Sequence, residues 1–335
     1  MKNKGLITVS IIAILFLCVL CVQKKPYYEE SGSVFRTIYH IKYQASKPLT
    51  DKIDAELQAF NLSMNPFNPN SIISKVNRNE DVEVDEWFTV VFNKAMEVSA
   101  NSYGAFDVTI APLINLWGFG FENADSISQQ AIDSIKAFIG YKKVRIENKR
   151  VIKDDPRIKL NFSAIAKGYA SDVVASVLER EGVENYMVEI GGEIAAKGKN
   201  PNGNCWGLLI PKPEDDPTGI KNERMAVTEL CEKCGMATSG NYRNYYIKDG
   251  KKYAHTIDPH TGYPSERSIL SATVIAPDCM TADAYATAFM VMGIEVAEKL
   301  AEKAPEIEYF LIYSDDASGK HKTKYSKGMK SMLRK

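Results

Sequence analysis

Two oxygen-bearing side chains, Asp283 and Thr287, stand four residues apart in the segment TADAYATA. On a helix this spacing places both side chains on one face. A carboxylate and a hydroxyl suit Mg²⁺, because this ion takes few protein ligands and completes its octahedron with water and phosphate oxygens. The same spacing also fits an Asp that caps a helix and a Thr that bonds back to its own helix. Spacing alone leaves both interpretations open.

Three other stretches hold residue types that ligand sites use. HTIDPHTGYP contains His255 and His260, and a histidine before a Pro-Gly turn can be a catalytic base, a ligand or a polar loop residue. NFSAIAKGYASD places Lys167 where the chain enters a helix, whose N-terminus favours phosphate, although close packing would also explain the small residues there. GAFDVTIAPLINLWGFG holds Asp107 among apolar neighbours, either as a turn residue or as a polar ligand contact.

Composition and missing motifs exclude several function classes. Lys plus Arg and Asp plus Glu number 42 each, so no global charge attracts nucleic acid or anionic lipid. The chain has no G-x-x-x-x-G-K-[ST] loop, no G-x-G-x-x-G after a strand and no H-E-x-x-H. Nucleotide-binding folds of these types are therefore without support.

The elements that must position these residues are read from periodicity and from turn residues. Apolar spacing typical of helices occurs in the segments 49–65, 85–104, 127–140, 164–183 and 280–306, the last as two helices. Alternation and β-branched residues predict strands in the segments 34–45, 185–198, 205–212, 225–230, 235–240, 243–259, 269–277 and 307–316, the last as the terminal strand, and a hairpin at 144–154. We expect the strands from 185 onwards to continue one sheet. Strands and helices do not alternate strictly, and no linker divides the chain, so we predict one large α+β domain over residues 23–335.

The N-terminus has the pattern of an export signal. Lys2 and Lys4 precede an apolar run, and a polar spacer follows it. We therefore expect residues 1–22 to be either a cleaved lipoprotein signal or an uncleaved membrane anchor. Cys18 and Cys21 are both candidates for lipid attachment, and Cys21 is favoured because it ends the apolar run. In either case the globular part is expected outside the cytoplasm and tethered to the membrane, on the periplasmic or extracytoplasmic side.

Four cysteines remain in the domain. Cys231 and Cys234 form a lone C-x-x-C, which lacks the second pair or the histidines of a zinc site. In an exported protein these two cysteines could form a disulfide or remain free thiols beside a turn. The sequence leaves these alternatives open.

Seven motifs in this order resemble those of the ApbE-type flavin transferases. They are FNPNSIISKVN, GAFDVTIAPLINLWGFG, NFSAIAKGYASD, VEIGGEI, MATSGNY, HTIDPHTGYP and MTADAYATAFMVMG. Each is common by itself, but the ordered set is specific. The resemblance implies a T-fold-related α+β domain.

The resemblance also implies an exported, often lipid-anchored lipoprotein that depends on Mg²⁺ and uses FAD as a substrate. Such an enzyme transfers the FMN half of FAD to a Thr or Ser hydroxyl of an acceptor protein and releases AMP. The family's acceptors are flavin-carrying subunits of membrane redox complexes with a D-G-x-[ST]-G-A-[ST]-like motif. One alternative is an FAD diphosphatase that gives FMN and AMP. A second is a tethered flavin-binding protein without turnover, against which the predicted metal pair argues.

The resemblance assigns roles residue by residue. The Mg²⁺ ligands would be the side chains of Asp283 and Thr287 and the carbonyls of Ala164 and Ala286. The FAD contacts would be Phe35, Phe67, Ala105, Phe106, Asp107, Asn161, Lys167 and Ile257. His255 is the candidate base. Three FAD contacts depart from the family pattern. Asn161 stands where an Asp is usual, and Phe35 stands at a position that is often Met. Phe67 replaces a Tyr, so that it can stack but cannot donate a hydrogen bond.

Overall fold

The computed structural model describes residues 25–120, 127–213, 223–242, 245–248, 251–315 and 321–334. The expected signal or anchor at residues 1–22 therefore lies outside the described residues. Within the described residues, no helix has the length and apolar character needed to cross a bilayer.

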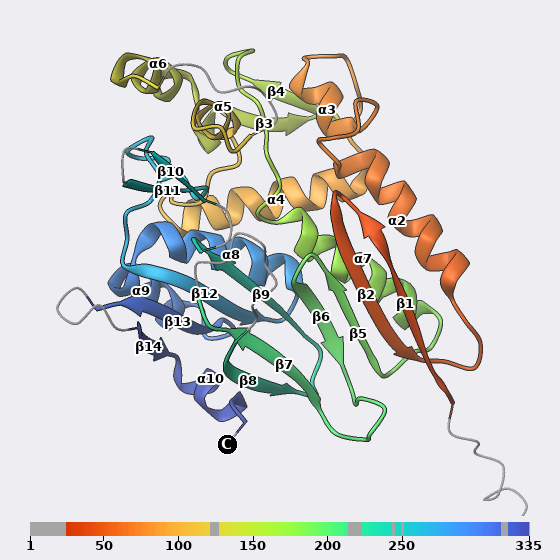
Figure 1. The fold of residues 1–335 in the computed structure, drawn as a ribbon. Coiled ribbons are helices and arrows are strands. Elements are labelled where there is room, and N and C mark those ends of the chain that lie inside the picture. Colours follow the sequence, from red (N-terminus) through yellow and green to blue (C-terminus); the bar gives the residue numbers. More distant parts are fainter. Residues whose placement is uncertain are drawn as a thin grey trace, which may run out of the picture.

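One eight-stranded antiparallel sheet forms the centre of the molecule (Figure 1). Its strand order is β1-β2-β5-β6-β9-β12-β13-β14. The bounds are β1 Tyr27–Val34, β2 Thr37–Gln44, β5 Tyr186–Ile190, β6 Glu193–Lys197, β9 Cys234–Gly240, β12 Ile269–Ala276, β13 Glu308–Ser314 and β14 His321–Tyr325. Segments far apart in the sequence thus become neighbours, and the α+β prediction is confirmed.

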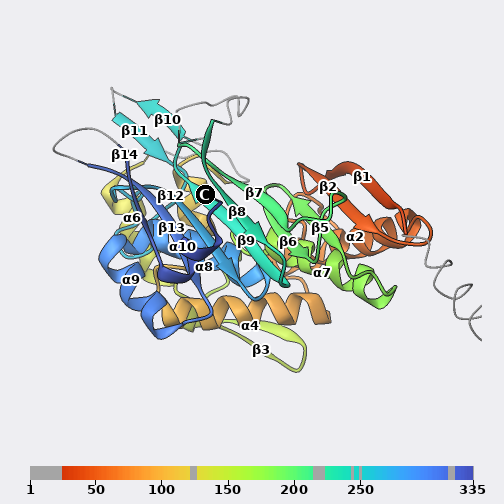
Figure 2. The same cartoon turned by 90° about the horizontal axis from the view of Figure 1, so that it is seen from below.

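A helical layer covers one face of this sheet, while the other face carries a smaller sheet (Figure 2). The principal helices are α2 Thr50–Met64, α4 Glu86–Asn101, α7 Ala166–Arg180, α8 Cys279–Met292 and α9 Ile294–Lys303. Nearly every residue of α8 is buried. This explains why α8 is apolar on all sides, since it packs against α7, α4 and the sheet at once.

The smaller sheet consists of β7 Trp206–Pro211 and β8 Arg224–Leu230. Its alternating residues Trp206, Leu208 and Ile210 are buried in a second core against β6, β9 and β13, which α10 Lys327–Met332 closes. The expectation that these strands continue the central sheet is therefore wrong. The hairpin lies face to face on that sheet, because the buried face of β7 has to be covered by another apolar surface.

The remaining elements lie around the two layers. They are α3 Ile72–Asn77, α5 Ala111–Leu116, α6 Gln129–Phe138, the 3₁₀ turn Tyr141–Lys143, and the hairpins β3 Val144–Glu147 with β4 Arg150–Lys153 and β10 Tyr245–Lys248 with β11 Lys251–Ala254. The hairpin β10–β11 also forms its own sheet rather than joining the central one.

Two strand predictions need further correction. The segment 34–45 is not one strand, because Phe35 and Arg36 have φ values of +52° and +60° and form the turn between β1 and β2. The strand predicted as terminal, β13, is followed by β14 and α10. The first difference arises because the turn at Phe35 and Arg36 has no glycine or proline at its positive-φ positions.

A disulfide joins Cys205 to Cys231, with a Cα–Cα distance of 4.7 Å. Both alternatives for the C-x-x-C segment are therefore wrong, since Cys231 pairs outside the motif and Cys234 is the free thiol. The hairpin register explains the pairing: Trp206 faces Leu230, so the next residues outward, Cys205 and Cys231, meet at the open end of the hairpin.

Two glycines allow three backbones to meet at the first turn of α8. A Cβ at Gly168 of α7 would lie 2.3 Å from the carbonyl oxygen of Cys279, and one at Gly235 of β9 would lie 2.2 Å from the Cys279 nitrogen and Cα. The turn is also capped, because Asp172 of α7 accepts hydrogen bonds from the amides of Cys279 and Met280 at 2.9 and 2.8 Å.

We expect Gly168→Ala to lower the free energy of unfolding by about 1–3 kcal/mol, because the added methyl group has to displace backbone rather than a flexible side chain. The matched control is Gly207→Ala in β7, where the new Cβ would meet its nearest atoms at 3.5 Å. Urea unfolding of both variants measures the difference. Equal stability of the two would show that the α7–α8 contact is not tight.

Candidate active site

A cavity of about 810 Å³ brings together most of the residues singled out in the sequence. Its walls come from the loop after α4, the start of α7, strands β5, β6, β7 and β9, the loop after β11, and α8. The sequence-predicted residues that line it are Phe67, Ala105, Phe106, Asp107, Asn161, Ala164, Lys167, His255, Ile257, Asp283 and Thr287. Phe35 and Ala286 are not among the lining residues.

A buried ionic cluster lies where α7, α8 and β6 meet. The Nζ of Lys167 is 2.6 Å from Oε1 of Glu193. The Oδ2 of Asp283 accepts a hydrogen bond from the Gly168 amide at 3.1 Å. Burial alone would lower the pKa of Lys167, but the carboxylates of Asp283 and Glu193 outweigh it and raise that pKa above its usual value. The lysine therefore stays protonated, which suits contact with an anionic ligand.

Sequence reasoning missed Glu193 as a site residue. Its side chain is 5% exposed, and its Oε2 is a buried oxygen without a hydrogen-bond partner. Burial raises the pKa of Glu193 to about 7, with Lys167 opposing the shift and Asp283 adding to it. The GGE segment was the available signal, because its two glycines have positive φ values and form the turn that directs Glu193 toward α7.

The residues proposed for a metal fit a hard, oxygen-preferring cation. The amide of Gly168 donates to Asp283, and Ala164, four residues earlier, lines the cavity with a carbonyl that accepts no backbone hydrogen bond from the described part of the chain. The hydroxyl of Thr287 lies 3.0 Å from that of Ser239 and also lines the cavity. One carboxylate, one hydroxyl and one carbonyl match the few ligands that Mg²⁺ takes from a protein. Across the described residues no three His, Cys, Asp or Glu side chains are grouped for a metal.

The side chain of Asp107 connects two loops at the cavity wall by hydrogen bonds. Its Oδ1 accepts hydrogen bonds from the amide and the hydroxyl of Thr109 at 2.7 and 2.6 Å, and its Oδ2 accepts one from the Tyr141 amide at 2.8 Å. The side chain is 9% exposed, and burial raises its pKa while these donors oppose the shift. The structure thus shows a carboxylate that binds loop backbone and also lines the cavity, and its contact with a ligand stays a prediction.

Phe67 and Phe35, the aromatic residues outside the apolar wall that are predicted to contact FAD, lie in different surroundings. Phe67 is 38% exposed, lines the cavity and carries the Arg36 guanidinium 3.9 Å above its ring. Phe35, in the neighbouring β1–β2 turn, packs edge-on against Phe60 of α2 with ring centroids 5.6 Å apart. Asn161 binds the amide of Ser163 through its side-chain oxygen, which an Asp would also do.

The two histidines of HTIDPHTGYP have different surroundings. His255 lines the cavity and contacts Phe119 edge-on. His260 instead binds Asp258 through Nδ1 at 3.1 Å and reaches the Tyr103 carbonyl through Nε2 at 3.0 Å, outside the cavity lining. Of the two, only His255 is positioned to exchange a proton with a molecule in the cavity.

Comparison with known proteins matches the chain to one family. The model of the ApbE family matches residues 35–311. The FAD:protein FMN transferase of Vibrio cholerae is 38% identical over 91% of this chain and 93% of its own, and that of Escherichia coli K12 is 34% identical over 90% and 87%. The solved flavin transferase ApbE from Vibrio cholerae superposes with a TM-score of 0.81 at 36% identity, covering 92% of this chain and 99% of its own. The Pseudomonas stutzeri flavinyl transferase ApbE in its apo form also gives 0.81, at 30% identity and covering 93% and 98%.

We expect the pH dependence of stability to change in Glu193→Gln. A carboxyl group whose pKa is raised on folding contributes stability at low pH and loses it as the pH rises through the folded pKa. For Glu193 this loss of stability is expected between about pH 4.5, its ordinary pKa, and about pH 7, its pKa in the folded protein. Wild-type stability relative to the variant should therefore fall by at least about 1 kcal/mol between pH 5 and pH 8, since one pKa unit corresponds to about 1.4 kcal/mol. Urea unfolding without metal at both pH values measures it, and parallel profiles would contradict the assignment.

Proposed function

The chain belongs to the ApbE family, and we propose that it transfers the FMN half of FAD to a Thr or Ser hydroxyl of an acceptor protein in a Mg²⁺-dependent reaction that releases AMP. The observation that carries this proposal is the convergence of Lys167, Asp283, Thr287 and His255 on one cavity. An ammonium group and a hard-cation site suit a diphosphate, and a histidine suits removal of a hydroxyl proton.

The proposed reaction is a substitution at phosphorus. The acceptor oxygen attacks the phosphorus of the FMN half, and the bond from that phosphorus to the bridging oxygen breaks. The electron pair remains on the bridging oxygen, which leaves as part of AMP, and His255 takes the hydroxyl proton. Positioning and charge neutralisation supply most of the rate enhancement in such transfers.

The chain's own residues divide these tasks. Lys167 neutralises phosphate charge, and Glu193 fixes its side chain through the 2.6 Å contact. Asp283, Thr287 and the carbonyls of Ala164 and Ala286 would hold the ion. Bound Mg²⁺ supplies Lewis-acid neutralisation of the diphosphate oxygens.

The flavin contacts belong to the same proposal. Phe67 offers a ring face, while Asp107 and Asn161 border the cavity with polar groups. The buried neighbours Ala105, Phe106 and Ile257 add apolar surface, while Phe35 packs on Phe60 beside the β1–β2 turn, and its contact with FAD stays a prediction.

The protein's location is part of the proposal. We expect export and membrane tethering through residues 1–22, which would place the cavity on the same side of the membrane as extracytoplasmic acceptor subunits. The disulfide between Cys205 and Cys231 supports this location, because disulfides persist in oxidising compartments.

The test combines the purified protein, FAD, Mg²⁺ and an acceptor protein with a D-G-x-[ST]-G-A-[ST]-like motif. A fluorescent flavin band on the acceptor in a denaturing gel, together with AMP in solution, supports the transferase. AMP without flavin on any acceptor supports the FAD diphosphatase instead. FAD binding without AMP supports a flavin carrier.

In this assay we expect Asp283→Asn to lower the transfer rate at least about 100-fold, because an electrostatic contact to the reacting phosphates is lost. Asn keeps the shape of the side chain and can still accept from the Gly168 amide. Asp278→Asn in the same helix is the control, since Asn caps a helix as well as Asp does. Equal rates and equal Mg²⁺ titrations for Asp283→Asn and wild type would refute the metal-site assignment.

We expect His255→Ala to lower the transfer rate by about 10²–10⁴-fold while FAD still binds, because a positioned general base contributes about that much. His260→Ala is the matched control from the same loop and should keep a rate near that of wild type. Stopped assays for AMP, with FAD binding followed by flavin fluorescence, separate the two effects. Full transfer by a His255→Ala protein that binds FAD would exclude the histidine as the base.

A further inference from the structure

Strand β7 has an edge that no other described strand covers. The Arg334 amide donates to the Val227 carbonyl of β8 at 2.8 Å, so the peptide groups of Val227 face away from β7. Val227 pairs with Leu209, and in an antiparallel ladder both residues of such a pair direct their peptide groups outward. The N–H and C=O of Leu209 therefore face the open edge, as do those of Gly207 two residues earlier.

This open edge borders the candidate active site. Gly207, Leu209 and Pro211 all line the cavity, and Leu209 is 38% exposed. Met187 and Glu189 of β5 line the same cavity from the central sheet, and Met187 also packs against the core beneath the β7–β8 hairpin. A channel thus runs from the site along β7, with one strand edge as its wall.

The two edge strands of the central sheet differ from β7 in position, and β14 also differs in composition. Strands β1 and β14 end the central sheet on opposite sides, and none of their residues lines the cavity. The exposed residues of β14 include Lys322 and Lys324, the kind of charge that keeps an edge from pairing with other chains. The outward positions of β7 carry no charge, and only Pro211 at its end lacks an N–H. The edge of β7 is therefore open to pairing at Gly207 and Leu209, the positions that lie beside the cavity.

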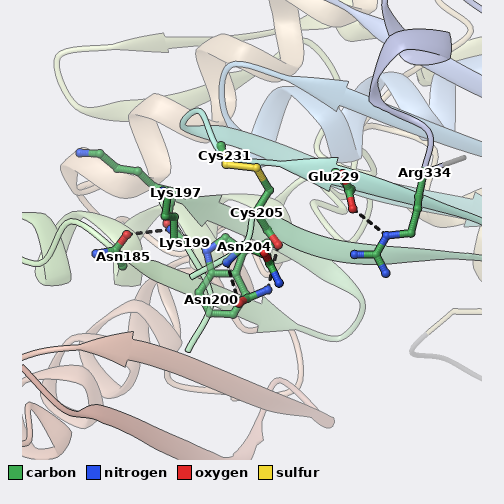
Figure 3. Close-up of a disulfide and its surroundings, with 10 residues drawn as sticks. Asn185, Lys197, Lys199, Asn200, Asn204, Cys205, Glu229, Cys231 and Arg334 are labelled. Carbon is green, nitrogen blue, oxygen red and sulfur yellow. Dashed lines mark hydrogen bonds and ion pairs between the residues drawn. A yellow bond between two sulfur atoms is a disulfide. The ribbon is translucent and has the colours of Figure 1, made fainter. Parts of the chain in front are cut away.

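A disulfide and several side-chain hydrogen bonds fix the loop that precedes β7, and with it the start of the open edge (Figure 3). The disulfide between Cys205 and Cys231 closes the hairpin where β7 begins. Asn200 donates from its side chain to the Cys205 carbonyl at 2.9 Å, and its side-chain oxygen accepts from the amides of Asn202 and Asn204. A strand edge fixed in this way loses little freedom when another chain pairs with it.

We propose that the acceptor polypeptide binds as an added strand along β7, with backbone hydrogen bonds to Gly207 and Leu209, and so delivers its hydroxyl to the cavity. This inference rests on the proposed transfer to a protein hydroxyl. In an extended segment alternate side chains face opposite ways, so one Thr or Ser can enter the site while its neighbours point away. Main-chain pairing supplies affinity without requiring a long sequence match.

The first test is Leu209→Pro, which removes the outward N–H but none of the bonds between β7 and β8. We expect kcat/KM for the acceptor protein to fall roughly tenfold or more, because a pairing hydrogen bond is lost and the ring obstructs the added strand. Gly207→Pro makes the same change at the other outward position. Near-UV circular dichroism identifies the variants that keep the native fold.

The matched control is Ser33→Pro on the free edge of β1. Ser33 pairs with Ile38, and the Ile38 carbonyl accepts a hydrogen bond from the amide of Gly191, which follows β5. The peptide groups of Ile38 therefore face away from β1, and those of Ser33 face the outer edge of the sheet. This variant should transfer flavin at the wild-type rate. A loss in Ser33→Pro equal to that in Leu209→Pro would show that the effect is not specific to β7 and would overturn the proposal.

A second test needs no variant of this chain. Hydrogen exchange is measured on the wild-type protein with an acceptor whose reactive hydroxyl residue is replaced by Ala. Protection of segment 206–211 on binding is expected, with no change in β1. If wild type transfers flavin but this segment is not protected and Leu209→Pro keeps its kcat/KM, the β7 proposal is wrong. If wild type transfers flavin to no acceptor, the proposed function itself fails, and that outcome is distinct.

Discussion

The contact on which the site depends is the packing of the first turn of α8 against two other backbones. Gly168 and Gly235 leave room for this approach, since a methyl group at either position would overlap Cys279. Asp172 caps the same turn from α7. Because α8 is held at its beginning, the side chain of Asp283 one turn later has a fixed position relative to α7. Helix geometry then carries Thr287 onto the same face.

This contact also creates an unusual charge arrangement. Two buried carboxylates, Asp283 and Glu193, share one ammonium group from Lys167. Burial raises the pKa of both acids. Because two carboxyl groups face one ammonium group, the cluster carries at most one excess negative charge. A diphosphate would add further negative charge, and a divalent cation beside Asp283 would offset it. The electrostatics and the oxygen donors therefore lead to the same type of ligand.

Local patterns in the sequence were sufficient for the longer helices and for most strands, but not for the short helices α3, α5 and α10 or for the assembly of the elements. The periodicity of α7 and α8 predicts both helices, and ordered motifs identify Lys167 and Asp283. Glu193 was missed because its partner, Lys167, lies on another element and the pairing depends on the β5–β6 turn. The partner of Cys231 depends on the register of β7 and β8, which one strand pattern cannot define. Alternation likewise shows that one face of β7 is buried, but not which surface covers it.

The inner face and the outer edge of the small β7–β8 sheet have different consequences. Its inner face adds a second core that includes Trp206 and Met329 and stabilises the far side of the central sheet. That core requires β7 and β8 to lie on top of the central sheet, so β7 cannot use its outer edge to join it. The edge consequently remains available beside the cavity that holds Asp283. An enzyme that modifies a small molecule could close the entrance of its cavity completely. One that modifies a protein needs an accessible surface beside the cavity, such as an unpaired strand edge, on which an extended chain can bind.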